Sequence, residues 1–201
     1  MIQTKQIALT EHFIVSPEST SDFAAAKIII FAEMHLDTTF RKQSQQLIQA
    51  LATNQDFILY EGYPSLKLIT IQKAPQGLIP CYGWDDINAH SASMELLRRF
   101  KKPKHFFDIY AAIITSIQNA HYLNKIKEYA FSRNQSLIHT LQTLNDMGPG
   151  RFFITLGRNH LEDAHLKKYL QEQPTYIIYS KYPPKPTQAE VQAYYYNDTD
   201  N

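Results

Sequence analysis

The feature that most constrains the fold is a strand–helix–strand pattern between residues 27 and 60. Residues 27–31 read Lys-Ile-Ile-Ile-Phe, a β-branched and aromatic run that is typical of a strand buried on both faces. Residues 40–53 place Leu47 and Leu51 on one stripe of an amphipathic helix, and residues 56–60 form a second apolar run. Because a helical crossover is the usual connection between parallel strands, the pattern predicts a parallel βαβ unit.

The rest of the chain extends this unit into one α/β domain. Further strands are expected at residues 78–82, 151–156 and 176–180, and a helix is expected to end near residue 172. Residues 91–147 are mainly helical in pattern and form an insertion between strands; apolar residues around much of the circumference of 106–130 indicate a buried helix. We expect a central, mainly parallel sheet with flanking helices over residues 1–186 and a polar tail at 187–201.

Composition narrows the class of protein. A length of 201 residues fits a single domain, and 44% hydrophobic with 19% charged residues is typical of a globular chain. A formal net charge of +1 gives no overall field that would attract nucleic acid or an anionic membrane. The single cysteine, Cys81, excludes an internal disulfide framework. No apolar run is long enough for a signal peptide or a membrane span, so we expect a cytoplasmic protein, with secretion by a signal-less route left open.

Polar side chains follow the predicted strands at the points where each strand ends. Glu33 and His35 come after the first strand, Glu61 ends the second, and His160 follows the strand at 151–156. Glu33 and His35 are two residues apart, so in extended chain they point to the same side. Ligands of open parallel sheets bind at the carboxyl ends of the strands. The sequence therefore predicts one polar site to which segments distant in the chain contribute.

These residue types support two kinds of water activation. Two histidines with one or two carboxylates match the ligand set of a divalent metal ion, which lowers the pKa of a bound water to about 7. Without a metal, a histidine would act as the general base while a carboxylate orients its ring. Zinc, manganese and iron all suit such nitrogen and oxygen ligands, so the metal's identity stays open.

Other polar residues have simpler interpretations. Asp85 and Asp86 precede a predicted helix and are interpreted as caps. Cys81 lies inside a predicted strand, which disfavours a nucleophilic role. The remaining histidines lie outside the predicted strand ends and are interpreted as surface or packing residues: His12, His90, His105, His121, His139 and His165.

Four short motifs in this order resemble the Tiki/TraB/ChaN/erythromycin-esterase superfamily over residues 27–179. The family's first strand ends in a Gly-Glu-x-His or Gly-x-x-His element, where this chain has Ala-Glu-Met-His at 32–35. A second strand that ends in glutamate, a helical Arg-Asn element and a late Gly-x-x-His element follow, at 59–61, 133–134 and 157–160. The resemblance implies a Tiki-like α/β core and a site lined by the matching residues: Glu33, His35, Glu61, Arg133 and His160.

Members of this superfamily differ in activity. Tiki proteins are metal-dependent proteases, erythromycin esterases open a macrolactone, and ChaN-like proteins bind haem. The expectation for this chain is a hydrolase that cleaves an ester or amide bond in a small molecule or peptide, with a divalent ion held by His35, Glu61 and His160. Arg133 would stabilise the developing negative charge. Two alternatives stay open, a haem-binding protein with His35 as the iron ligand and an inactive effector or interaction domain; the oligomeric state is not predicted.

Overall fold

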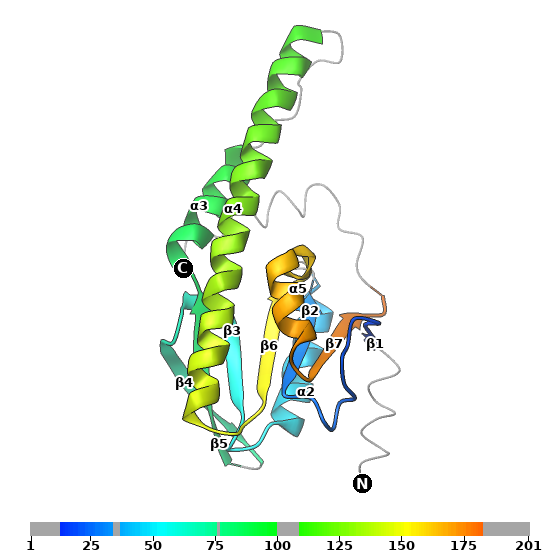
Figure 1. The fold of residues 1–201 in the computed structure, drawn as a ribbon, viewed down its shortest axis with the longest axis vertical. Coiled ribbons are helices and arrows are strands. Elements are labelled where there is room, and N and C mark those ends of the chain that lie inside the picture. The colour runs from blue at the N-terminus through cyan, green and yellow to red at the C-terminus, as the bar shows by residue number, and fades with distance from the viewer. Residues whose placement is uncertain (1–12, 34–36, 76, 100–108, 183–201) are drawn as a thin grey trace.

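The computed structural model describes residues 13–33, 37–75, 77–99 and 109–182, with side chains described from residue 118 onward in the last range. In these residues a seven-stranded sheet has the order β1-β7-β2-β6-β3-β5-β4 (Figure 1). Its strands are β1 (Phe13–Val15), β2 (Ile28–Glu33), β3 (Phe57–Pro64), β4 (Leu68–Ala74), β5 (Gly77–Asp85), β6 (Phe152–Gly157) and β7 (Thr175–Ser180). The helices are α2 (Thr38–Leu51), α3 (Ile87–Arg99), α4 (Ile109–Met147), the 3₁₀ turn η1 (Arg158–Glu162) and α5 (Ala164–Gln171). The predicted α/β fold class is confirmed.

The five inner strands run parallel, as the strand–helix–strand pattern predicts. β2 pairs with β6 and β7, and β3 pairs with β6 and β5, all in parallel. β6 therefore lies between the two strands of the predicted βαβ unit, and all six residues of β2 are buried. The edge strands β1 and β4 are antiparallel to their neighbours. The carboxyl ends of β2, β6, β3 and β5 consequently meet at one edge of the sheet.

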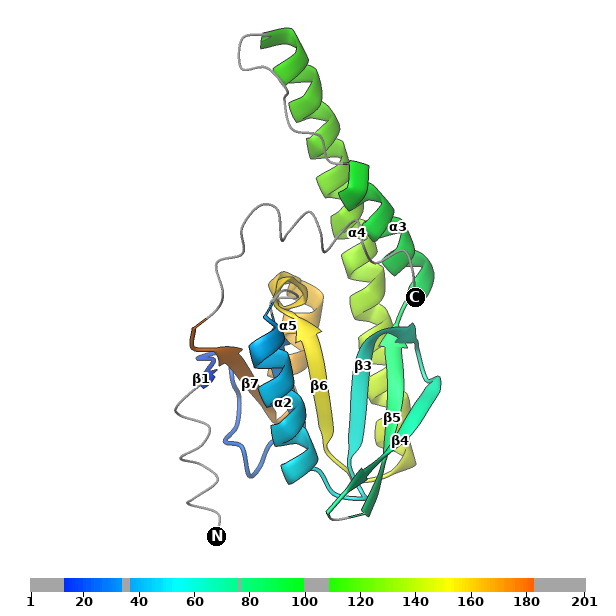
Figure 2. The ribbon, with the colours of Figure 1, turned by 180° about the vertical axis from the view of Figure 1, so that it is seen from behind.

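Each face of the sheet has its own hydrophobic core. Helix α2 covers one face, where Phe40 and Ile48 pack with the alternate β2 residues Ile29 and Phe31 (Figure 2). Helices α4 and α5 cover the other face and pack against Ile28, Ile30 and Ala32 through their buried leucines (Figure 1). Because side chains alternate along a strand, the face on which a polar residue lies at a strand end follows from this pattern.

Helix α4 differs from the expectation of a buried helix at 106–130. Residues 118–130 are exposed or half-buried, whereas Leu137, Leu141 and Leu144 further along are fully buried. A helix of 39 residues is about 58 Å long, roughly three times the length of a six-residue strand. The sheet can cover only the C-terminal part, and the rest of α4 extends past it beside α3 (Figure 1).

No helix in the described ranges has both the length and the apolar composition needed to cross a membrane. The predicted domain limits at 1–186 and the predicted tail at 187–201 stay predictions, because every residue after 182 lies outside the part of the chain that the structure describes.

Candidate functional site

An irregularity in β3 shapes the edge of the sheet where the site lies. Between the pairs Tyr60–Gly83 and Pro64–Asp85, three residues of β3 lie opposite one residue of β5. Gly62, inside this bulge, has a φ of 81°, a backbone conformation that favours glycine. The bulge directs the Gly62 N–H to Asp85, whose Oδ2 accepts it at 3.0 Å. It thus holds the ends of β3 and β5 together at the point where their carboxylates lie.

Asp85 and Arg133 form the buried centre of the site. The Asp85 side chain is fully buried, and its two oxygens accept hydrogen bonds from Nε and Nη2 of Arg133 at 2.7 and 2.8 Å. Burial raises the pKa of Asp85, but hydrogen bonds from His90 and Arg133, the guanidinium charge and the Gly62 amide outweigh it, so this pKa lies below 3.8. Burial likewise lowers the pKa of Arg133, yet Asp85 and Glu61 more than compensate and raise it. Both groups are therefore charged at neutral pH.

Glu61 connects this centre to the end of β6. Its Oε1 accepts a hydrogen bond from Nη2 of Arg133 at 2.5 Å, and its Oε2 accepts one from the Gly157 N–H at 3.1 Å. The carboxylate is only 14% exposed. Its Oε1 also lies 3.5 Å from Nε2 of His160, the residue expected at the end of the next strand. Two residues 99 positions apart thus face each other, as the convergence of parallel strand ends predicts.

The ring of His160 is fixed by α4. Nδ2 of Asn134 donates to the His160 carbonyl at 3.3 Å, which turns Oδ1 of Asn134 toward Nδ1 of His160 at 2.6 Å. Since Oδ1 can only accept, Nδ1 carries the proton and the neutral ring has its lone pair on Nε2, facing Glu61. Trp84 packs edge-on against the same ring, with the centroids 5.5 Å apart. The imidazole is buried, and its orientation is set from two sides.

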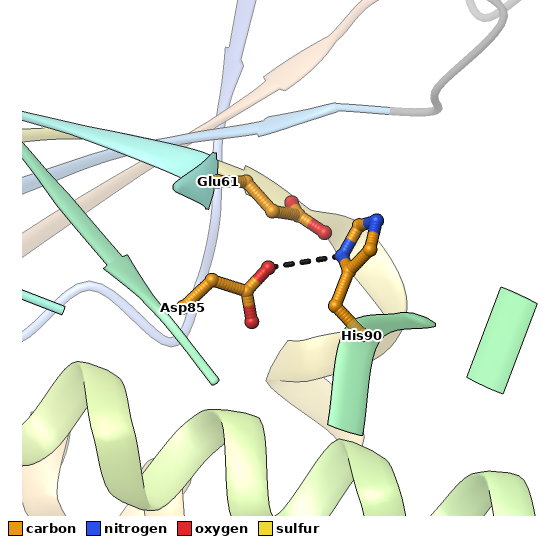
Figure 3. Close-up of side chains that lie close together, drawn as sticks. All are labelled: Glu61, Asp85 and His90. Atoms are coloured by element: carbon orange, nitrogen blue, oxygen red, sulfur yellow. Dashed lines mark hydrogen bonds and ion pairs between the residues drawn. The ribbon is translucent and has the colours of Figure 1, made fainter. Parts of the chain in front are cut away.

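His90 and Asp85 form a further pair that differs from the interpretation of both residues from sequence. Nδ1 of His90 lies 3.0 Å from Oδ2 of Asp85 (Figure 3). Only Asp86 acts as the expected cap, because its Oδ1 accepts the N–H groups of Asn88 and Ala89 at the start of α3. Asp85 is instead a buried anchor, and His90 is a member of the site rather than a surface or packing residue. No sequence signal distinguishes these two aspartates, since both directly precede the helix.

The structure separates Glu33 from the other predicted site residues. Glu33 follows Ala32 in β2, so it lies on the face covered by α2, where Arg41 donates to both of its oxygens at 3.1 and 3.0 Å. Glu61, Arg133 and His160 come together on the face covered by α4. His35 lies outside the described residues. Three of the five predicted residues therefore form one network, while a fourth lies on the opposite face.

A possible divalent-cation cluster in the described residues consists of Glu61, Asp85 and His90. Each offers one potential ligand atom, and these atoms lie within 4.8 Å of one another (Figure 3). The donors around Asp85 disfavour it as a ligand, because its Oδ2 already accepts from Arg133, Gly62 and His90. The separation of Glu61 and His160 is closer to metal geometry: two ligands of a tetrahedral zinc ion lie roughly 3.4 Å apart.

Comparisons with known proteins add no relative. No family model matches the chain, and no curated protein and no solved structure matches it. The resemblance to the Tiki/TraB/ChaN/erythromycin-esterase superfamily thus stays a prediction from four short motifs, and the function has to be argued from the site itself.

Proposed function

We propose that this protein is a hydrolase that cleaves an ester or amide bond in a small molecule or peptide, using a water activated by His160 and Glu61. The observation that supports this most is the 3.5 Å approach of His160 Nε2 to Glu61 Oε1. Both side chains are held by further hydrogen bonds: His160 by Asn134 at Nδ1, and Glu61 by Gly157 at Oε2 and by Arg133 at Oε1. Two fixed acceptors that face each other form a binding position for a proton donor.

We place a water molecule beside these two atoms. A water oxygen can lie within hydrogen-bond distance, about 2.8 Å, of both atoms and donate one proton to each. Transfer of one proton to Nε2 of His160 would leave a hydroxide held by Glu61 for attack on an acyl carbon. His160 then carries a positive charge, which the neighbouring carboxylate stabilises. Preorganisation of both partners reduces the reorganisation needed during the reaction.

Arg133 supplies a donor for the developing negative charge. In the described part of the chain its hydrogen bonds use Nε and Nη2, which leaves the two N–H groups of Nη1 for a ligand. Its side chain is 10% exposed. A cation aimed at the carbonyl oxygen stabilises the tetrahedral intermediate of ester and amide cleavage more strongly than the ground state.

The test is hydrolysis of a panel of short-chain esters, lactones and peptide amides by the full chain. We expect measurable turnover on at least one class of ester or amide, with kcat reduced about 10²- to 10⁴-fold in Glu61→Gln and in His160→Gln. The matched controls Glu172→Gln and His165→Gln carry the same substitutions at exposed residues and should retain wild-type rates. Folded wild-type protein without activity on any class, or equal rates in site and control variants, would contradict the proposal.

A metal-assisted form of the same reaction is part of the proposal. A zinc, manganese or iron ion held by His35, Glu61 and His160 would supply Lewis-acid activation of the water. Elemental analysis and an absorbance scan of untagged wild type, His35→Ala and His160→Ala distinguish the cases. Near-stoichiometric metal that is lost in both variants supports the ion, and a Soret band lost with His35 supports the haem-binding alternative. Metal-free, colourless and active protein leaves His160 and Glu61 as the activating pair.

A further inference from the structure

The pairing of His90 with a fully buried carboxylate does more than help to keep that carboxylate ionised. Asp85 already has its charge balanced by two hydrogen bonds from Arg133, and it accepts the Gly62 N–H as well. The side chain of His90 is 30% exposed. What the contact does fix is the orientation of the imidazole.

That orientation leaves one nitrogen available for chemistry. Asp85 is a carboxylate and can only accept, so Nδ1 of His90 is the donor in their 3.0 Å contact. Nε2, on the far side of the ring, points away from Asp85 (Figure 3). A buried aspartate that holds the Nδ1 proton and leaves Nε2 open is the arrangement by which histidine transfers protons in hydrolases.

The start of α3 holds this pair in place. Asp86 caps the helix through the N–H groups of Asn88 and Ala89, and the Ser132 hydroxyl of α4 donates to its other oxygen at 2.6 Å. His90 lies in the first turn of that helix, and its N–H donates to the Asp86 carbonyl at 2.8 Å. The same site therefore contains a second histidine, within 4.8 Å of the Glu61 and Asp85 ligand atoms.

We propose that His90, positioned by Asp85, is the general acid that protonates the leaving group, an assignment that rests on the hydrolase function proposed above. Water attacks the acyl carbon as its proton passes to Nε2 of His160, and the carbonyl π electrons move to the oxygen near Arg133. The oxyanion then reforms the carbonyl, and the C–O or C–N bond breaks. Its electron pair stays on the leaving atom, which takes the proton from Nε2 of His90; His90 therefore enters the cycle as the imidazolium, protonated at both nitrogens, and becomes neutral in this step. Both histidines return to their starting state by exchanging one proton each with solvent.

Two acetate esters with different leaving groups test this assignment. 4-Nitrophenolate leaves without protonation, whereas the alkoxide of ethyl acetate requires a proton. In His90→Gln we expect release of acetate from ethyl acetate to fall about 10²- to 10⁴-fold, and hydrolysis of 4-nitrophenyl acetate to change by less than about threefold. His160→Gln should lose activity on both esters, and the exposed-histidine control His139→Gln on neither.

The outcomes separate the two claims. Equal losses on both esters in His90→Gln, or no loss on either, would overturn the assignment of His90 while leaving the hydrolase function standing. Wild-type protein that hydrolyses neither ester, nor any member of the panel, would overturn the hydrolase function and this assignment with it. Asp85→Asn provides a second variant, expected to reproduce the leaving-group dependence of His90→Gln in whatever fraction of the protein is folded.

Discussion

Arg133 joins two carboxylates that come from different strands. It is the one cation in direct contact with both Glu61 and Asp85 in the described residues, and its guanidinium also lies 5.9 Å from the Trp84 ring. Two buried or half-buried negative charges thus share one positive charge. Removal of that charge would leave the carboxylates desolvated without compensation, which is among the costliest changes in a protein interior.

Substitution of Arg133 tests this charge balance. We expect Arg133→Met to lower the free energy of unfolding by about 3–5 kcal/mol, since it leaves buried charges unpaired. Arg99→Met removes an exposed arginine that pairs with Glu95 on the surface of α3, and should cost at most about 0.5 kcal/mol. Urea unfolding of both variants measures the difference. Similar small losses in the two variants would contradict the central role of Arg133.

Part of the site can be predicted from sequence, and the rest depends on tertiary contacts. Glu61 lies toward the carboxyl end of β3 and His160 shortly after the end of β6, so sheet geometry brings them to the same edge. Asp85 and Asp86 look alike before a helix, and only the approach of α4 decides which one meets an arginine. The role proposed for His90 depends on Asp85, which is turned inward and contacts its ring. Glu33 illustrates the opposite error, because strand alternation directs it to the face covered by α2.

At the scale of elements, the bulge in β3 is the feature that builds the site. It inserts residues between the two paired positions, and the positive φ of Gly62 lets the chain turn there. Gly83 lies opposite, and a Cβ on it would meet the Pro64 carbonyl at 2.3 Å. Close approach of the two backbones requires glycine at both positions for different reasons, conformation at Gly62 and space at Gly83.

Substitution of Gly62 by alanine tests the conformational requirement for glycine separately from the requirement for space. A Cβ on Gly62 meets no atom within 4 Å, so Gly62→Ala changes only the cost of its φ of 81°. We expect a loss of about 1–2 kcal/mol in the free energy of unfolding. Gly148→Ala also adds a methyl group to open space, but without a positive φ, and should be neutral or slightly stabilising. Equal stabilities of the two variants would show that the bulge is not under conformational constraint.

The strands with the clearest sequence signal, β2 and β6, are buried on both faces. β2 is a continuous apolar run, and it is found within two residues of its predicted limits. β1 has three residues, and β4 is exposed at most positions, so neither carries a pattern that distinguishes it from a loop. Apolar residues around much of the circumference of α4 predict a buried helix. The helix is longer than the strands of the sheet, however, so some of these residues lie outside the core.

At the scale of the whole molecule, each end of the parallel strands has an ion pair that contains a buried aspartate, Asp56 at one end and Asp85 at the other. Asp56 precedes β3 at the opposite edge from the site and accepts hydrogen bonds from the side chain and N–H of Arg151. Burial raises the pKa of Asp56, but Arg151 and Thr53 outweigh it, so this pKa lies below 3.8, like that of Asp85. A depressed carboxyl pKa in the folded state favours folding while the group is ionised.

Acid should therefore weaken the fold. Stability from Asp56 and Asp85 is fully present above their unfolded pKa and is lost as the pH falls through their lower folded values. We expect the free energy of unfolding to decrease below about pH 4, and Asp56→Asn to show a smaller decrease than wild type. Asp146→Asn changes an exposed aspartate, so its free energy of unfolding should decrease with falling pH as much as that of wild type. Urea titrations at neutral pH and at about pH 3 measure the free energy of unfolding. An equal decrease between these pH values in all three proteins would contradict the prediction.

The most direct test of the central claim is a double-mutant cycle on the best ester or amide substrate, with kcat measured for wild type, Glu61→Gln, His160→Gln and the double variant. If both side chains act on one water, each single substitution should reduce kcat about 10²- to 10⁴-fold, and the double variant should be no slower than the slower single variant. Single variants that retain wild-type rates, or a double variant whose loss is the product of the two single losses, would contradict the account.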